Sequence, residues 1–194
     1  MKKIRRNKQL FKLIIITSIM ILFGLLYMAI IKEKDKELIK ISLDSFFKSI
    51  KNINHTKILI NSFITNIVSI SIVFLLSMSI IGIPIILIFL SYKSFVLGFT
   101  ISSIIYYYKF KGIIISLIYI IPLIINLFLI FMLSYYGITI SKKLIKVLFY
   151  KKELPIKKDI KRYTRLFIVL ISITIVNSII EGYIIPIILS LLQI

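Results

Sequence analysis

The chain of 194 residues contains no cysteine and no tryptophan, a single histidine, and only seven acidic residues against 26 lysines and arginines. The lack of cysteine excludes disulfides, thiolate metal sites and thiol nucleophiles. His55 has no acidic residue at ligand spacing, so we interpret it as a solvated loop residue. Motifs for phosphate binding (GxxxxGK[ST]) or zinc proteolysis (HExxH) are missing. We therefore expect no enzymatic activity, no catalytic residues, no cofactor and no metal site.

The apolar content decides the class of protein. The chain is 59% hydrophobic with a mean hydropathy of +1.04, whereas soluble domains are about 45–50% apolar. Residues 58–92 and 112–141 contain no charge, and about 20 apolar residues already cross a bilayer. We therefore predict an all-α integral membrane protein, with residues 1–194 forming a single polytopic domain. In such a protein the net charge of +19 indicates contact with anionic lipid and not with nucleic acid.

We predict about five transmembrane helices. They cover residues of about 10–31, 58–80, 84–108, 112–140 and 166–190. The apolar run of the first is longer than that of a signal peptide, so we expect this helix to be retained.

Basic residues between the spans predict the orientation. Seventeen of the 26 lysines and arginines lie in residues 1–12, 81–93 and 141–165. Because cytoplasmic segments carry the excess of basic residues, we predict a cytoplasmic N-terminus and an extracytoplasmic C-terminus. Residues 141–165 would then be a basic cytoplasmic loop.

Lys93 fits this scheme poorly, because it follows Pro84 by nine residues and would lie deep in the third span. Gly82 and Pro84 break the helix between the second and third spans. Two explanations remain open: residues 82–92 form a short or re-entrant helix, or Lys93 extends its ammonium to the inner surface.

The outer segment 32–57 has the pattern of an amphipathic helix. Its apolar residues recur at spacings of three and four, with lysines on the other side of the helix. The apolar face contains Ile39, Leu43, Phe46, Phe47 and Ile50. Such a helix lies on the outer leaflet, or docks a partner protein there; the two are compatible.

Glu181 is the one acidic residue inside a predicted span. A carboxylate at mid-membrane costs roughly 2.5–3.5 kcal/mol and marks a functional hypothesis. It would be a structural pin that accepts hydrogen bonds from serine, threonine or backbone donors of a neighbouring helix, or a proton or substrate site in a polar cavity. The spans offer few further polar groups for a transport path, mainly Asn61, Asn66, Asn126 and Asn177.

Four motifs in order along the chain carry a resemblance. They are Gly82-Ile83-Pro84, Lys93 to Gly98, Pro122, and Glu181-Gly182 followed by Pro186. With their spacing, they make the chain resemble stage II sporulation protein M of endospore-forming Firmicutes over nearly its whole length. The residues that map onto the structural motifs of that family are Gly82, Pro84, Lys93, Gly98, Pro122, Glu181, Gly182 and Pro186.

The resemblance implies a non-enzymatic membrane anchor and scaffold. In that family the partners, stage II sporulation proteins D and P, degrade peptidoglycan outside the membrane during septal thinning and forespore engulfment. The expected location is the cell membrane, at the sporulation septum and the engulfing mother-cell membrane. The alternative is a transporter or permease-associated subunit with Glu181 in a polar cavity. The sequence leaves a homo-oligomer open.

Overall fold

The structure is a computed structural model that describes residues 2–52, 55–150 and 156–191, and all regular elements in these ranges are helical. The elements are α1 (Lys2–Ile30), α2 (Glu33–Asn52), α3 (His55–Ser77), α4 (Gly82–Tyr150), α5 (Ile156–Ile179), the π-helix η1 (Ile180–Ile184) and α6 (Ile185–Leu191). Four helices in these ranges are long and apolar enough to cross a membrane. The prediction of an all-α membrane protein is confirmed at this level.

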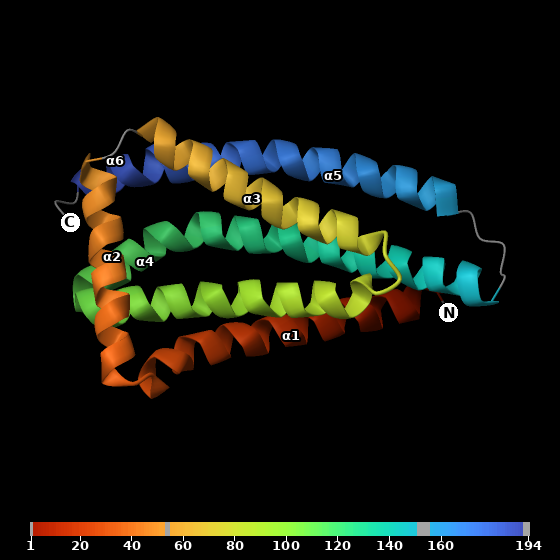
Figure 1. Cartoon of the computed structure of the whole chain (residues 1–194), viewed down its shortest axis with the longest axis horizontal. Helices are drawn as coiled ribbons and strands as arrows, with labels where there is room; N and C mark the ends of the chain where they lie inside the picture. Colours follow the sequence, from red (N-terminus) through yellow and green to blue (C-terminus); the bar gives the residue numbers. More distant parts are fainter. Residues whose placement is uncertain (1, 53–54, 151–155, 192–194) are drawn as a thin grey trace.

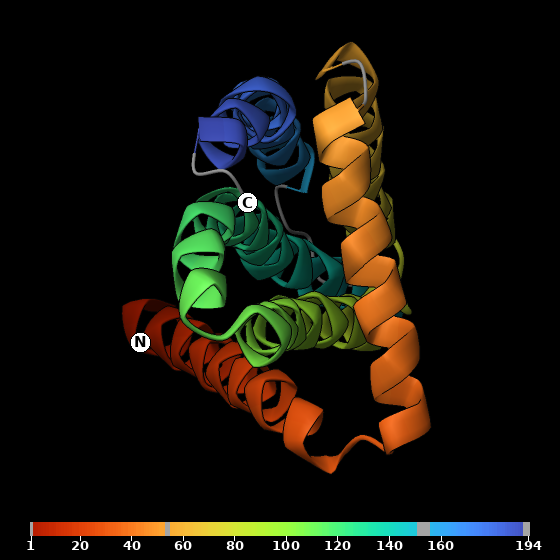
Figure 2. The ribbon, with the colours of Figure 1, turned by 90° about the vertical axis from the view of Figure 1, so that its left-hand side faces the viewer.

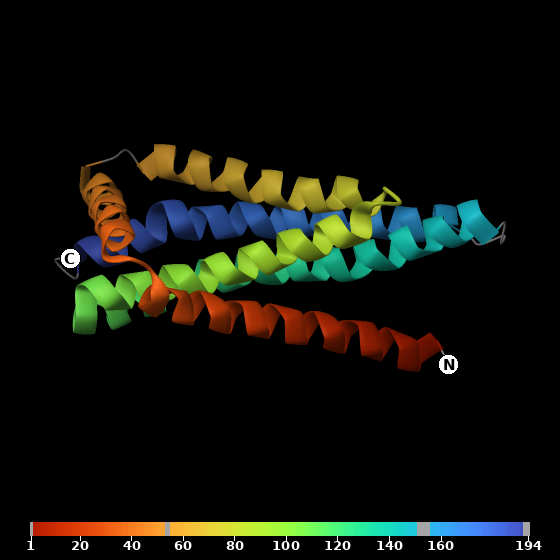
Figure 3. The ribbon, with the colours of Figure 1, turned by 60° about the horizontal axis from the view of Figure 1, so that its bottom comes forward.

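α4 is a hairpin of two helical arms, residues 82–108 and 110–150. The arms meet at Lys109, whose backbone angles (φ 49°, ψ −122°) are not helical, and they run side by side in opposite directions (Figure 1, Figure 3). Gly112 makes the tight reversal feasible, because a Cβ there would lie 2.5 Å from the Ile104 carbonyl oxygen. The predicted spans 84–108 and 112–140 fall in these two arms.

The structure gathers the chain connections at two ends (Figure 1). One end holds the start of α1, the turn between α3 and α4, the end of α4 and the start of α5. The other holds α2, the Lys109 turn and α6. The segments that the sequence assigns to the cytoplasm therefore lie together, and those assigned to the outside lie together at the opposite end.

The bundle is apolar both inside and outside. Its core contains Ile70, Ile86, Leu90, Ile130 and Leu133, all fully buried. Large apolar side chains also cover the outward faces of the long helices, among them Phe23, Leu75, Ile88, Leu117 and Phe128. Soluble proteins rarely expose such extensive apolar surface, so a lipid environment accounts for this exterior.

Two glycines bring α1 close to the first arm of α4. A Cβ on Gly24 would lie 2.8 Å from the backbone nitrogen of Phe99, and a Cβ on Gly98 would collide with the Ile21 carbonyl. Ser102 also donates a hydrogen bond across this contact to the Gly24 carbonyl, at 3.4 Å. Small residues at a helix contact, with a serine bonding across it, are typical of helices that associate in a membrane.

The structure narrows one open alternative and corrects one prediction. Residues 82–92 are continuous with the rest of the first arm, so they do not form a separate short helix. Pro84 lies in the first turn, where a missing N–H disrupts no helical bond. Most of the predicted basic loop 141–165 is helical, because α4 continues to Tyr150 and α5 begins at Ile156; residues 151–155 lie outside the described residues. Lys143 and Asp159 join these two helical extensions through an ion pair of 2.5 Å.

The strained turn gives a first prediction. Lys109 is the sole non-glycine residue with positive φ in the described ranges, and strain of this kind costs of order 1–3 kcal/mol. Lys109→Gly should raise the thermal unfolding midpoint of the detergent-solubilised protein, followed by circular dichroism. The control is Lys111→Gly, which places a glycine where φ is not positive and should lower or leave the midpoint. A midpoint for Lys109→Gly below that of Lys111→Gly would contradict the strained turn.

Candidate functional site

A polar cluster lies between three of the long helices. Each helix contributes two residues four positions apart, so that both lie on the same helix face. The pairs are Ser62 and Asn66 of α3, Pro122 and Asn126 of the second arm of α4, and Asn177 and Glu181 of α5 and η1. We call these six residues the Glu181 cluster.

The Glu181 carboxylate accepts hydrogen bonds from two helices. Asn66 Nδ2 donates to Oε2 and Asn177 Nδ2 donates to Oε1, each at 3.3 Å, and the Ser62 hydroxyl lies near the carboxylate. Both amide distances exceed the usual 2.9–3.0 Å for such bonds. These contacts are the kind that the structural-pin hypothesis requires. The donors, however, are mainly asparagine amides, whereas we expected serine, threonine or backbone groups from the sequence.

The asparagines extend the cluster to the second arm of α4. Asn126 Nδ2 donates to Asn66 Oδ1 at 2.6 Å, and Asn177 Nδ2 also reaches the Pro122 carbonyl at 3.3 Å. Because a carbonyl can only accept, this contact fixes which end of the Asn177 amide faces it. Among the described residues, neither Asn126 Oδ1 nor Asn177 Oδ1 has a hydrogen-bond donor. The cluster thus holds more acceptors than donors.

Prolines explain the local backbone of the cluster. Pro186 has no N–H, and its ring would clash with the Gly182 carbonyl one helical turn earlier. The chain widens there into η1, where the Ile185 N–H bonds back five residues to the Ile180 carbonyl. Such π-bulges often occur at functional sites. Pro122, fully buried, similarly removes the N–H that the Ile118 carbonyl would otherwise accept.

Gly182 sets the distance between η1 and α3. A Cβ at Gly182 would lie 2.5 Å from Leu59 Cβ and 2.8 Å from the Leu59 backbone nitrogen. The close approach brings Glu181 within reach of the polar face of α3. The residues Pro122, Glu181, Gly182 and Pro186 of the predicted motif set are therefore brought together at one place.

The other four residues of that set lie elsewhere. Gly82 begins α4 against the Leu76 carbonyl, Pro84 occupies the first turn, and Gly98 contacts α1. The Lys93 ammonium lies 5.6 Å from the centre of the Phe89 ring, a weak cation–π contact. These residues shape the bundle and do not contact the Glu181 cluster in any described interaction.

α2 is amphipathic, as predicted, and crosses the end of the bundle from the end of α1 to the start of α3 (Figure 2). Its apolar face packs on the chain itself: Leu43 and Phe47 contact the core cluster formed by Ile104, Ile115, Ile185 and Leu189. Ile39 is half-buried. Phe46 is 42% exposed and also contacts the rings of Phe47 and Tyr119. Ile50 lies in α2, but its side chain is outside the described residues.

The outward face of α2 contains apolar residues that the sequence interpretation missed. Leu38 and Ile41 are each 59% exposed, one helical turn apart. Their spacing of three is visible in the sequence, but the larger apolar face beside them obscured it.

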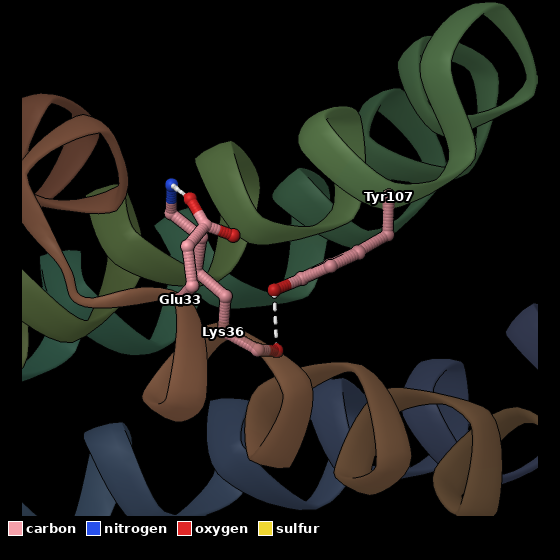
Figure 4. Close-up of polar contacts among 3 residues, drawn as sticks. All are labelled: Glu33, Lys36 and Tyr107. Carbon is pink, nitrogen blue, oxygen red and sulfur yellow. Dashed lines mark hydrogen bonds and ion pairs between the residues drawn. The ribbon is translucent and has the colours of Figure 1, made fainter.

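Tyrosines of the first arm hold α2 in place. The Tyr107 hydroxyl donates to the Lys36 carbonyl at 2.5 Å, and the Tyr108 hydroxyl donates to Asp44 Oδ1 at 2.6 Å. Lys36 pairs with Glu33 at 2.8 Å (Figure 4), and this hydrogen bond raises the pKa of the Lys36 ammonium. The first turns of α2, together with Tyr106 and Tyr107, line an open cavity of about 410 Å³.

Glu181 forms no ion pair with another described residue. The ion pairs formed by the described residues are Lys36–Glu33 and Lys143–Asp159, so neither involves Glu181. The same part of the chain has no group of three or more histidine, cysteine or acidic side chains that could hold a metal ion.

The arrangement defines an all-helical membrane protein with one acidic residue held between its spans. A family model described as stage II sporulation protein M matches residues 13–186. The chain belongs to the stage II sporulation protein M family, as the resemblance indicated. Comparison with the curated proteins and with the solved structures gives no match.

The contact of Gly182 with Leu59 gives a second prediction. Gly182→Leu should separate η1 from α3 and lower the free energy of unfolding by at least about 1–3 kcal/mol, the usual cost of overpacking. SDS denaturation of the protein in mixed micelles, followed by circular dichroism, measures this change. Ile184→Leu is the control, since Ile184 is 46% exposed two residues away and should tolerate the change. Equal stability of the two variants would refute the close approach.

Proposed function

We propose that this chain is a non-enzymatic membrane anchor of a peptidoglycan-degrading complex that acts in septal thinning and forespore engulfment. Membership of the stage II sporulation protein M family is consistent with a sporulation membrane protein. The family resemblance assigns the hydrolytic chemistry to the partner proteins D and P. The anchor's task is then to present a stable surface on the outer side of the membrane.

The observation that carries the proposal is the position of α2. It lies across one end of the bundle, is tied to the first arm by Tyr107 and Tyr108, and exposes Leu38 and Ile41. The excess of basic residues lies in the segments at the opposite end, which favours an extracytoplasmic position for α2. We therefore place the docking surface for the partners on the outward face of α2, in the cell membrane at the sporulation septum.

This placement revises which residues of α2 matter. Leu43 and Phe47 support the helix from below, so their substitution should disturb the bundle itself. Leu38 and Ile41 are free to contact a partner that approaches from outside.

The experiment is co-purification of proteins D and P with the tagged chain from sporulating cells. Leu38→Glu together with Ile41→Glu should abolish co-purification and leave the membrane level of the chain unchanged, because both side chains are exposed. The control is Glu37→Lys with Lys40→Glu, which alters two exposed residues of the same helix at unchanged net charge. Retained co-purification of the double glutamate variant would contradict the docking surface.

The Glu181 cluster supports a second candidate, a transporter or permease-associated subunit. Two asparagines donate to the acid and a third, Asn126, donates to one of them, which is more polar groups than the scaffold role requires. Deletion in the native sporulating host separates the two functions. Engulfment arrest with normal vegetative growth is the result expected for the anchor, whereas normal engulfment with a solute-specific growth defect would favour transport.

A further inference from the structure

We propose that three lysines at the end of the bundle opposite α2 form a binding site for the phosphate group of an anionic phospholipid. Lys12 of α1 and Lys142 and Lys146 of the second arm of α4 contribute the ammonium groups. The start of α1 and the end of α4 lie together at this end (Figure 1). This site is independent of the anchoring role, and it is more specific than the general attraction of basic segments to anionic lipid.

Gln9 of α1 brings the lysines of the two helices together. Its Nε2 donates to the Tyr135 carbonyl at 3.0 Å and to Thr139 Oγ1 at 3.3 Å. Its Oε1 accepts a hydrogen bond from Lys142 Nζ at 3.0 Å. These contacts use both ends of the Gln9 amide and fix the start of α1 against the second arm. A basic residue that only sets the orientation of a membrane protein needs no such contact, because its charge alone is sufficient.

The three ammonium groups have no compensating acid among the described residues. Lys12 and Lys146 both lie near Lys142 and repel its charge. Lys146 also follows Lys142 by four residues, a spacing at which like charges destabilise a helix. The one acidic residue that the structure describes at this end is Asp159, and it pairs with Lys143. An anion bound between the three lysines would remove their repulsion, and it can reach them because all three side chains are exposed.

The surroundings of the site favour a lipid over a free anion. Lys12 shares a face of α1 with Ile15 and Ile19, which follow it by three and seven residues. These two isoleucines are 41% and 51% exposed, so they form an apolar strip that leads from the ammonium group toward the middle of the bundle. A phospholipid matches this pattern, since its phosphate contacts the lysines while an acyl chain lies along the isoleucines. Basic groups between membrane-spanning helices bind lipid headgroups in this way.

The test measures lipid binding to the purified full-length protein in detergent by native mass spectrometry. Phosphatidylglycerol and phosphatidylcholine are titrated separately, because both contain a phosphate group but only the first has a net negative charge. We expect the protein to bind phosphatidylglycerol more tightly than phosphatidylcholine. Each charge near an anionic lipid contributes roughly fivefold to affinity. Lys12→Gln combined with Lys142→Gln and Lys146→Gln should therefore weaken phosphatidylglycerol binding about 100-fold, and Lys146→Gln alone about fivefold.

The matched control combines Lys157→Gln, Lys158→Gln and Lys161→Gln. These three lysines of α5 are exposed at the same end of the bundle, so the control variant has the same net charge as the site variant and should bind phosphatidylglycerol as the wild-type protein does. Replacement of the three site lysines by arginine should also preserve binding, since arginine keeps the charge and contacts phosphate. Both glutamine variants should keep the wild-type circular dichroism spectrum, because all six side chains are exposed.

Three outcomes overturn the proposal. One is equal affinity of the site variant and the α5 variant for phosphatidylglycerol, whether both lose binding or both keep it, because the three site lysines would then have no special role. Another is equal affinity of the wild-type protein for phosphatidylglycerol and phosphatidylcholine. The third is displacement of phosphatidylglycerol by inorganic phosphate at the same concentration, which would identify a site for a free anion.

Discussion

A carboxylate between the helices of a lipid-facing bundle is costly unless those helices supply its hydrogen bonds, and this constraint organises the end of the molecule that contains α2. Glu181 has to find its partners on other helices, and it finds them on α3 and α5. Three local features of the sequence bring these groups together. Gly182 lets η1 approach α3, Pro186 widens the helix into η1, and Pro122 presents its carbonyl to the same asparagine that holds the acid.

The cluster also links the interior to the surface that we assign to the partners. Ile180, next to Glu181, belongs to the same apolar core as Leu43 and Phe47 of α2. The helix across the end of the bundle therefore rests on the segment that the polar cluster fixes. A rigid support of this kind suits an anchor, because α2 can hold a partner at a fixed position only if the segment beneath it does not move.

Most of the fold could be predicted from the sequence because the apolar segments that form the spans are long. Apolar runs identify the spans, and the motif that contains Gly98 coincides with a close helix contact. The helical extensions around 141–165 could not be predicted, since basic residues fit a loop and a helix equally well. Asn66, Asn126 and Asn177 each lie four residues from another member of the Glu181 cluster, and this spacing is visible in the sequence. Which helix faces meet depends on packing, which the sequence does not show. The same holds for α2, whose apolar face packs on its own chain.

The central claim is that Glu181 ties α3 to η1, and a double-mutant cycle tests it most directly. The free energies of unfolding of Asn66→Leu, Glu181→Leu and the double variant are measured in mixed micelles at fixed sodium chloride. The account predicts a favourable coupling of about 1 kcal/mol, because either substitution alone already breaks the contact. Effects that add to within about 0.3 kcal/mol would contradict it.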